Sequence, residues 1–149
     1  MMYKTFHSRL VIALAMLAFL TFTAQSHAGM QSHAFANHHV VFQISNGSAQ
    51  EQELVLANAA NVLKYFGPTK VQIEIVAFGP GLRLLLKNNV HSKMIQSLHA
   101  EGIEFAACHN TMMKLHLTKA DLNPVAHVVP GGVIEIMRRE SEGWNYIRP

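Results

Sequence analysis

The sequence predicts an α/β fold: a three-layer sandwich in which a mostly parallel sheet of five strands carries helices on both faces. Three observations lead to this prediction. Strand-like and helix-like segments alternate along the chain, Gly, Pro and Asn mark the turns between them, and residues 29–149 have the length of one domain. Strands that alternate with helices are joined by right-handed crossovers, which produce a largely parallel sheet.

Residues 1–28 have the layout of a secretory signal peptide. Lys4 and Arg9 precede an apolar run over residues 10–22, and Ser26 and Ala28 form a small-x-small cleavage signal. The apolar run is shorter than the roughly 20 residues that a membrane-spanning helix needs. We therefore expect cleavage after Ala28, a periplasmic or secreted product, and no stable membrane insertion after cleavage.

The mature chain is expected to be nearly neutral and to form one domain. Removing Lys4 and Arg9 from the 12 basic residues leaves 10 against 9 acidic ones, without a cluster of Lys or Arg. Nucleic acid is therefore not an expected partner. The predicted organisation is a signal peptide at 1–28, a flexible leader at 29–38 and a single domain at 39–149.

The domain is predicted to open with a buried strand and a long helix. Residues 39–45 are mostly apolar, and Asn46-Gly47 is a turn signal. Ser48 and Glu51 have the spacing of a capping box, and apolar residues then recur at helical spacing until Gly67-Pro68 ends the helix.

The middle of the domain is predicted to contain two strands and two helices. The strands cover residues 71–78 and 103–107, where apolar residues alternate or run continuously. A short helix is expected over residues 82–87, and Ser92 is expected to cap a second helix that Gly102 ends in a left-handed conformation.

The last third is predicted to continue the alternation. Its expected elements are a helix at 110–117, a capped turn with Thr118 and Asp121, a strand at 126–129, a helix at 133–142 and an extended piece at 144–148. The turn Pro130-Gly131-Gly132 precedes the last helix, and Gly143 ends it.

Cys108 is the candidate nucleophile. It is the only cysteine, so the chain cannot form an intramolecular disulfide. It follows the strand at 103–107 and precedes a helix, where amide groups and the helix dipole favour the reactive thiolate. His109, Asn110 and Thr111 occupy supporting positions. The alternative interpretation is a small, buried, unreactive side chain at the end of a strand.

Further candidates lie in the loops that follow the strands, because ligands bind beyond the carboxyl ends of parallel strands. Four segments qualify: residues 45–48, 78–81, 108–111 and 130–132. The candidates for an anion-binding or ligand-binding loop are Asn46, Gly47, Gly79, Gly131 and Gly132. For residues 130–132, a plain turn is the alternative.

No metal site and no cofactor are predicted. Side chains near the cysteine resemble a soft-metal set: Cys108, His109, Met112, Met113 and His116. On a helix with a rise of 1.5 Å per residue, however, Cys108 and His116 would lie about 12 Å apart, too far to share one ion. The side chains of Met112, Met113 and Leu115 are instead expected to face the hydrophobic core from this helix.

Several segments resemble the DsrE/DsrF-like family. They are the opening strand at 40–44, the passage 102–112 that contains Cys108, and the tail at 128–137 with 142–147; the likeness covers about residues 39–149. The resemblance implies a small α/β fold with a parallel-rich sheet and assembly as homotrimers or homohexamers. The family includes sulfur-relay proteins, whose cysteine after the middle strand accepts sulfur as a persulfide, and Cys108 stands at that position.

The chain resembles the exported, signal-peptide-bearing branch of the family. The resemblance and the export signal together imply a periplasmic sulfur-handling protein, a sulfurtransferase or sulfur carrier in which Cys108 passes sulfane sulfur to a thiol or sulfur-carrier protein. The relay proteins act in the cytoplasm, whereas this chain has an export signal. Without a second cysteine, an oxidised Cys108 needs a thiol from outside or from another subunit. The alternative function is a non-catalytic oligomeric module of the same fold that binds a ligand or partner.

Overall fold

The computed structural model describes residues 36–149. The predicted signal peptide and the leader up to residue 35 lie outside the described residues. The described elements, in chain order, are β1 (His38–Ile44), α2 (Ala49–Phe66), β2 (Val71–Ala77), the 3-10 helix η1 (Gly79–Leu85), α3 (Ser92–Ala100), β3 (Ile103–Cys108), α4 (His109–Lys114), the 3-10 helix η2 (Lys119–Asp121), β4 (His127–Val129), α5 (Gly132–Ser141) and β5 (Asn145–Ile147). No helix in this part of the chain is long and apolar enough to cross a membrane.

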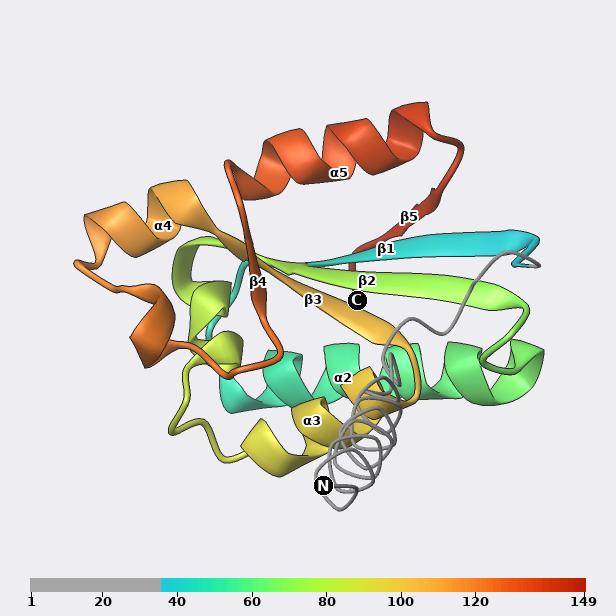
Figure 1. Ribbon diagram of the computed structural model, residues 1–149, viewed down its shortest axis with the longest axis horizontal. Helices are drawn as coiled ribbons and strands as arrows, with labels where there is room; N and C mark the ends of the chain where they lie inside the picture. Colours follow the sequence, from blue (N-terminus) through green and yellow to red (C-terminus); the bar gives the residue numbers. More distant parts are fainter. Residues whose placement is uncertain (1–35) are drawn as a thin grey trace, which may run out of the picture. The chain divides into compact units, whose positions relative to one another are not determined.

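The five strands form one sheet in the order β4-β3-β2-β1-β5, and every neighbouring pair is parallel. The α/β sandwich is therefore confirmed, and the sheet is entirely parallel. The chain adds β2, β3 and β4 outward from β1 in one direction, and then returns to place β5 on the other side of β1 (Figure 1). The carboxyl ends of β1 to β4 consequently share one edge of the sheet.

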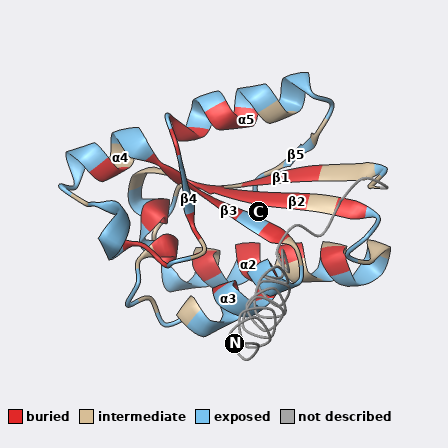
Figure 2. Cartoon of the chain, in the orientation of Figure 1, coloured by how far each residue is buried: buried red, intermediate tan, exposed pale blue. Residues whose placement is uncertain are grey.

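One face of the sheet carries the main hydrophobic core. Alternate residues of β1, β2 and β3 point to this face and pack against α2, α3 and η1, and the largest fully buried side chains include Phe42, Leu56 and Phe105. The central strands β2 and β3 and the carboxyl-terminal part of β1 are accordingly buried along most of their length in Figure 2. Burying each of these side chains stabilises the fold by about 1.5–3 kcal/mol, so this face provides most of the apolar stabilisation.

The opposite face is covered by α5 and has a much smaller apolar cluster, composed of Val41, Val76, Ala106, Val129 and Ile136. Figure 1 shows α5 on this face, across the sheet from α2 and α3. With so few apolar residues beneath it, α5 depends on other contacts to hold its position. Polar contacts with the strands therefore become important for the site.

Three helix starts differ from the sequence predictions. Ser48 accepts a hydrogen bond from the Glu51 amide (3.3 Å), but its own amide donates to Asn46 Oδ1 (3.0 Å), so the second half of the predicted capping box is absent there. Ser92 is the first residue of α3, because His91 holds the cap position. The helix expected at 82–87 begins instead at Gly79 and is a 3-10 helix.

The helix after Cys108 is shorter than the predicted 110–117. It ends at Lys114, because His116 adopts a left-handed conformation (φ 54°). The amides of His116 and Leu117 donate to the carbonyls of Met113 (3.2 Å) and Met112 (2.9 Å), a pattern typical of a Schellman motif. The expected core position is correct for Met112, which is buried, and wrong for Met113 and Leu115, which are exposed.

Candidate functional site

The four loop segments at the carboxyl edge of the sheet contact one another. A Cβ atom on Gly47 would lie 2.5 Å from the Pro80 carbonyl oxygen, so the first segment packs on the second. The Gly79 amide donates to Thr111 Oγ1 (2.9 Å), which joins the second to the third. A Cβ on Gly132 would lie 2.6 Å from the Phe78 ring, which places the fourth segment against the second.

Cys108 is the last residue of β3 and occupies the cap position of α4. Its side chain points to the α5 face, beside Val129 of β4 in the parallel register. The residue is buried, with 4% of its surface exposed. Its sulfur makes no close capping hydrogen bond to α4. The site is therefore a covered thiol at the junction of a strand and a helix.

The surroundings of Cys108 favour the thiolate. Burial by itself raises the pKa of the thiol, but the Thr111 hydroxyl and the amides of Gly132, Thr111 and Asn110 outweigh this effect and lower the pKa below its ordinary value. All four groups are donors, and donors stabilise a charged sulfur more than a neutral one. This is the electrostatic pattern of reactive cysteines.

Thr111 connects the thiol to the neighbouring loop. Its hydroxyl is the group that most lowers the pKa of Cys108, and its oxygen accepts a hydrogen bond from the Gly79 amide (2.9 Å). Because the Gly79 amide binds this oxygen, the loop after β2 helps to fix the Thr111 hydroxyl in place. Asn110 and Thr111 thus lie where the sequence places them, beside Cys108, and Gly79 is brought to them from the adjacent strand.

Gly132 belongs to this site for a steric reason. It is the first residue of α5, and its α-carbon approaches Phe78 so closely that a Cβ would lie 2.6–2.9 Å from three Phe78 atoms. This packing brings the Gly132 amide near the sulfur. Gly131 lies beside the Asn110 side chain, whose nitrogen would be 3.4 Å from a Cβ on Gly131.

The other sequence candidates lie apart from the thiol chemistry. Asn46 and Gly47 serve the start of α2 and its packing on Pro80. His109 is exposed and makes no hydrogen bond to Cys108 within residues 36–149. In the same part of the chain, no three His, Cys, Asp or Glu side chains lie close enough to hold a metal ion.

An ionic cluster beneath α5 was not anticipated from the sequence. Glu74, in the middle of β2, is fully buried, and both of its oxygens face Arg139 of α5 (2.8 and 3.2 Å). His127 of β4 lies 3.3 Å from the same carboxylate. A signal was present, because a carboxylate within a sheet covered on both faces needs a cationic partner from a helix or a neighbouring strand.

The opposite charges in this cluster stabilise the charged form of each partner. Burial raises the pKa of Glu74, but hydrogen bonds and charge from His127 and Arg139 outweigh it and lower that pKa below its ordinary value. The hydrogen bond to Glu74 raises the pKa of His127. Arg139 also contacts Glu104 (3.2 Å) and lies over the Trp144 ring (4.2 Å). α5 is thus fixed to the sheet by one multiply paired arginine.

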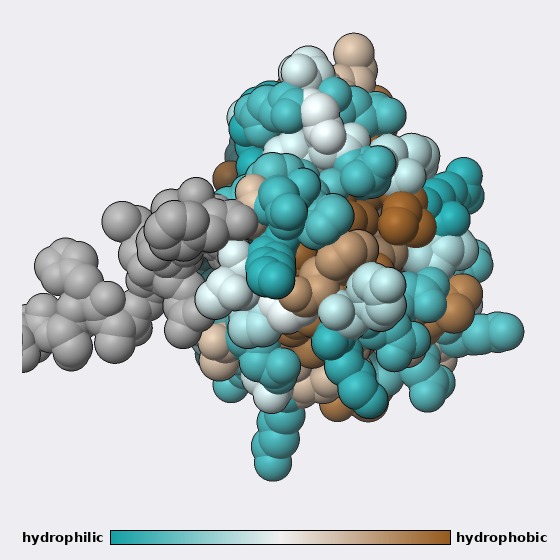
Figure 3. Space-filling view, turned by 90° about the vertical axis from the view of Figure 1, so that its right-hand side faces the viewer, coloured by the Kyte–Doolittle hydropathy of each residue, from teal (hydrophilic) through white to brown (hydrophobic). Residues whose placement is uncertain are grey.

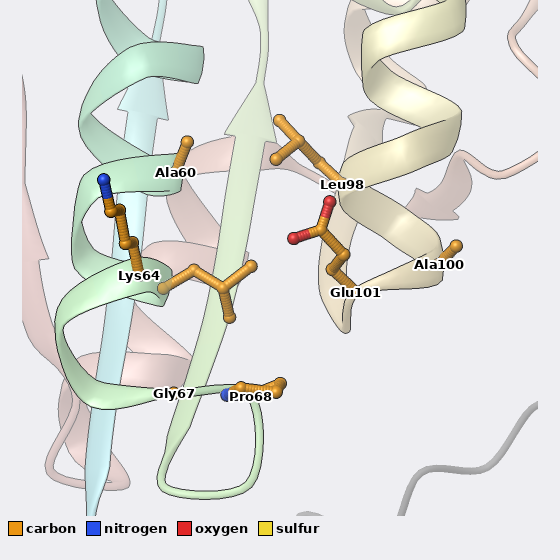
Figure 4. Close-up of a pocket in the computed structure, with 8 residues that line it drawn as sticks. Ala60, Lys64, Gly67, Pro68, Leu98, Ala100 and Glu101 are labelled. Carbon is orange, nitrogen blue, oxygen red and sulfur yellow. The ribbon is translucent and has the colours of Figure 1, made fainter.

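A separate pocket lies at the opposite edge of the sheet, where α2 and α3 end. Its volume is about 480 Å³, and it is lined by Ala60, Leu63, Lys64, Gly67, Pro68, Leu98, Ala100 and Glu101. In Figure 4, Ala60 and Leu98 face each other across the gap between the two helices. The residues around it precede β2 and β3, whereas Cys108 ends β3. This pocket is therefore not part of the thiol site.

The fold and the site together define a class: a small α/β protein with a parallel five-stranded sheet and a single thiol at a strand-to-helix junction. The model of the DsrE/DsrF-like family matches residues 38–149. The chain belongs to the DsrE/DsrF-like family.

A solved structure supports the same fold. The chain is similar to a protein of unknown function, MTH1491 from Methanobacterium thermoautotrophicum, with 34% sequence identity and a TM-score of 0.73. The match covers 76% of this chain and 100% of that one. No curated protein matches the chain. Family membership suggests a function related to sulfur relay, while the structural relative has no assigned activity.

Proposed function

We propose that this protein is a periplasmic sulfur carrier in which Cys108 accepts sulfane sulfur as a persulfide and relays it to an acceptor thiol. The observation that carries the proposal is the set of four donors, the Thr111 hydroxyl and three amides, that lowers the pKa of a buried thiol in a family that includes sulfur-relay proteins. The export signal in the sequence supports the periplasmic location.

The proposed reaction consists of two exchange steps at sulfur. The Cys108 thiolate attacks a sulfane sulfur of a polysulfide, a new S–S bond forms, and the remainder leaves with the electron pair as a shorter polysulfide anion. An acceptor thiolate then attacks the outer sulfur of the persulfide, takes that atom, and releases Cys108 as thiolate. The amides and the Thr111 hydroxyl stabilise the anionic sulfur before and after the cycle.

Burial imposes a condition on this chemistry. Since only 4% of Cys108 is exposed, a donor reaches the sulfur when the residues around it move apart locally. The short α4 and the first turn of α5 supply the three amides, so these are the segments whose opening exposes the thiol. A small anionic donor needs less opening than a protein does.

Treatment of the folded protein with polysulfide tests the proposal. Mass spectrometry is expected to find a single added sulfur on the peptide that contains Cys108, and none in the Cys108→Ser variant. A low-molecular-weight thiol should then remove the added sulfur, which is the transfer step. A folded protein whose thiol is neither modified by polysulfide nor alkylated across the accessible pH range contradicts the proposed function.

A second candidate function, as an oligomeric binding or assembly module, is favoured by exposed apolar side chains on α4 and α5. Met113, Val133, Ile134 and Met137 are each more than half exposed. Exposed apolar side chains that cluster on neighbouring elements are typical of interaction surfaces. Figure 3 shows a different face, at the other end of the strands, which is largely hydrophilic around a hydrophobic centre.

This candidate predicts a defined oligomer that depends on α5. Replacing Ile134 and Met137 together by Glu is expected to convert a trimer or hexamer into monomers, because charges at an apolar interface lose their hydration on assembly. Light scattering coupled to gel filtration measures the mass. The exposed Leu54→Glu variant on α2 is the matched control and should retain the oligomer. A monomeric wild-type protein contradicts this candidate.

A further inference from the structure

The position of α5 controls one of the donors to Cys108. The Gly132 amide is at the first turn of this helix, and it is one of the groups that lower the pKa of the thiol. Cys108 is carried by β3, whereas Gly132 is carried by α5. Their proximity therefore requires α5 to be held in one place over the sheet.

Few apolar contacts hold the helix there. α5 contributes one buried side chain, that of Ile136, to the apolar cluster on this face of the sheet. The close contact of Gly132 with Phe78 limits how near the first turn of α5 comes to the sheet. A steric limit does not keep the helix from moving away, so attractive contacts must hold it against the sheet. The most buried polar contact between α5 and the strands is the pairing of Arg139 with Glu74.

Glu74 is suited to this task by its burial and by its partners. No part of its side chain is exposed, both oxygens bind Arg139, and His127 contacts one of them. The other acidic groups near Arg139 are less buried or belong to α5 itself: Glu104 is half exposed, Glu135 lies on the same helix, and Glu142 caps its end. A buried two-oxygen contact from a central strand therefore sets where the helix lies.

We infer that Glu74 is a positioning residue for Cys108: by binding Arg139 it holds α5 so that the Gly132 amide stabilises the thiolate. The inference rests on the proposed function for its biological meaning, but its physical effect is on the thiol itself. Glu74 does not contact the sulfur. Its influence passes through Arg139 and along the two turns of α5 to Gly132.

The test compares Glu74→Gln with Glu140→Gln. The first keeps the shape of the side chain and removes the charge that Arg139 binds. The second removes the same charge from an exposed position on α5 that forms no ion pair within the described residues. The thiol pKa is measured from the pH dependence of alkylation, and the Gly132 amide is followed by NMR through the same titration.

Glu74→Gln is expected to raise the thiol pKa by about half a unit, which leaves roughly threefold less thiolate at pH values below the thiol pKa, and to weaken the response of the Gly132 amide. Glu140→Gln should match the wild type. A folded Glu74→Gln protein with an unchanged thiol pKa and an unchanged Gly132 response overturns the inference. Arg139→Lys, which keeps the charge but loses the two-nitrogen contact, provides the same test if Glu74→Gln does not fold.

The outcomes separate this inference from the proposed function. A raised thiol pKa in Glu74→Gln, together with no sulfur adduct on the wild-type protein, supports the positioning role and contradicts sulfur transfer. A sulfur adduct on the wild type with an unchanged thiol pKa in Glu74→Gln supports the transfer and contradicts the positioning role.

Discussion

Replacing Thr111 by Val is expected to raise the thiol pKa of Cys108 by about one unit, which leaves roughly tenfold less thiolate at pH values below the thiol pKa. The hydroxyl is the strongest of the groups that lower this pKa, and Val has the same shape without a donor. The substitution also leaves the Gly79 amide without its acceptor, so a loss of about 1–3 kcal/mol in the free energy of unfolding should accompany it.

Thr111→Ser is the matched control, because it keeps the hydroxyl and should stay near the wild type in both measurements. A thiol whose pKa is lowered by folding stabilises the protein above its unfolded pKa, and this stabilisation is lost as the pH falls through the folded pKa. The stability gap between the two variants should therefore be wider at alkaline than at acidic pH. Equal thiol pKa values in the Val and Ser variants would mean that the hydroxyl does not act on the sulfur.

Replacing Gly81 by Ala is expected to lower the free energy of unfolding by about 3 kcal/mol. A Cβ at this position would overlap the Ile44 carbonyl oxygen and lie 2.6 Å from its carbon and 2.9 Å from Ser45 Cα. These are backbone atoms, which cannot rotate away as a side chain would. The Gly81 amide also donates to the Ser45 carbonyl (3.1 Å), so the ends of β1 and β2 must separate.

Urea unfolding followed by circular dichroism measures this loss. Gly131→Ala is the control: its nearest neighbours are side-chain atoms of Ile134 (3.1 Å) and Asn110 (3.4 Å), which can adjust. Gly131 caps α5 without a side-chain bond, so the control should cost less than about 1 kcal/mol. If Gly81→Ala unfolds at the same urea concentration as the control, the two loops are not packed as closely as the structure indicates.

The strands were predictable because their signal is local. The alternation of Val71, Ile73 and Ile75 identifies β2 within a residue, and the apolar run after Gly102 identifies β3. Helix ends were less predictable, because they depend on which backbone groups find partners. No glycine marks the end of α4, where His116 adopts the left-handed conformation instead.

The partner of the buried carboxylate was the part of the fold that the sequence pattern could not identify. Glu74 alternates with apolar residues, as a solvent-facing strand position does, but α5 covers that face and supplies Arg139 as its partner. The two residues are far apart in the sequence. Only the crossover that brings α5 back over the sheet places them together.

The alternation of strands and helices, and the place of the lone thiol of Cys108 between a strand and a helix, could be read from the sequence, because neighbouring residues set both properties. Which donors lie near the sulfur depends on how distant elements pack together. The Gly132 amide comes from another element, and the Thr111 hydroxyl is oriented by Gly79 of a third. Contacts of this kind depend on how elements pack, and packing is a property of the whole sheet.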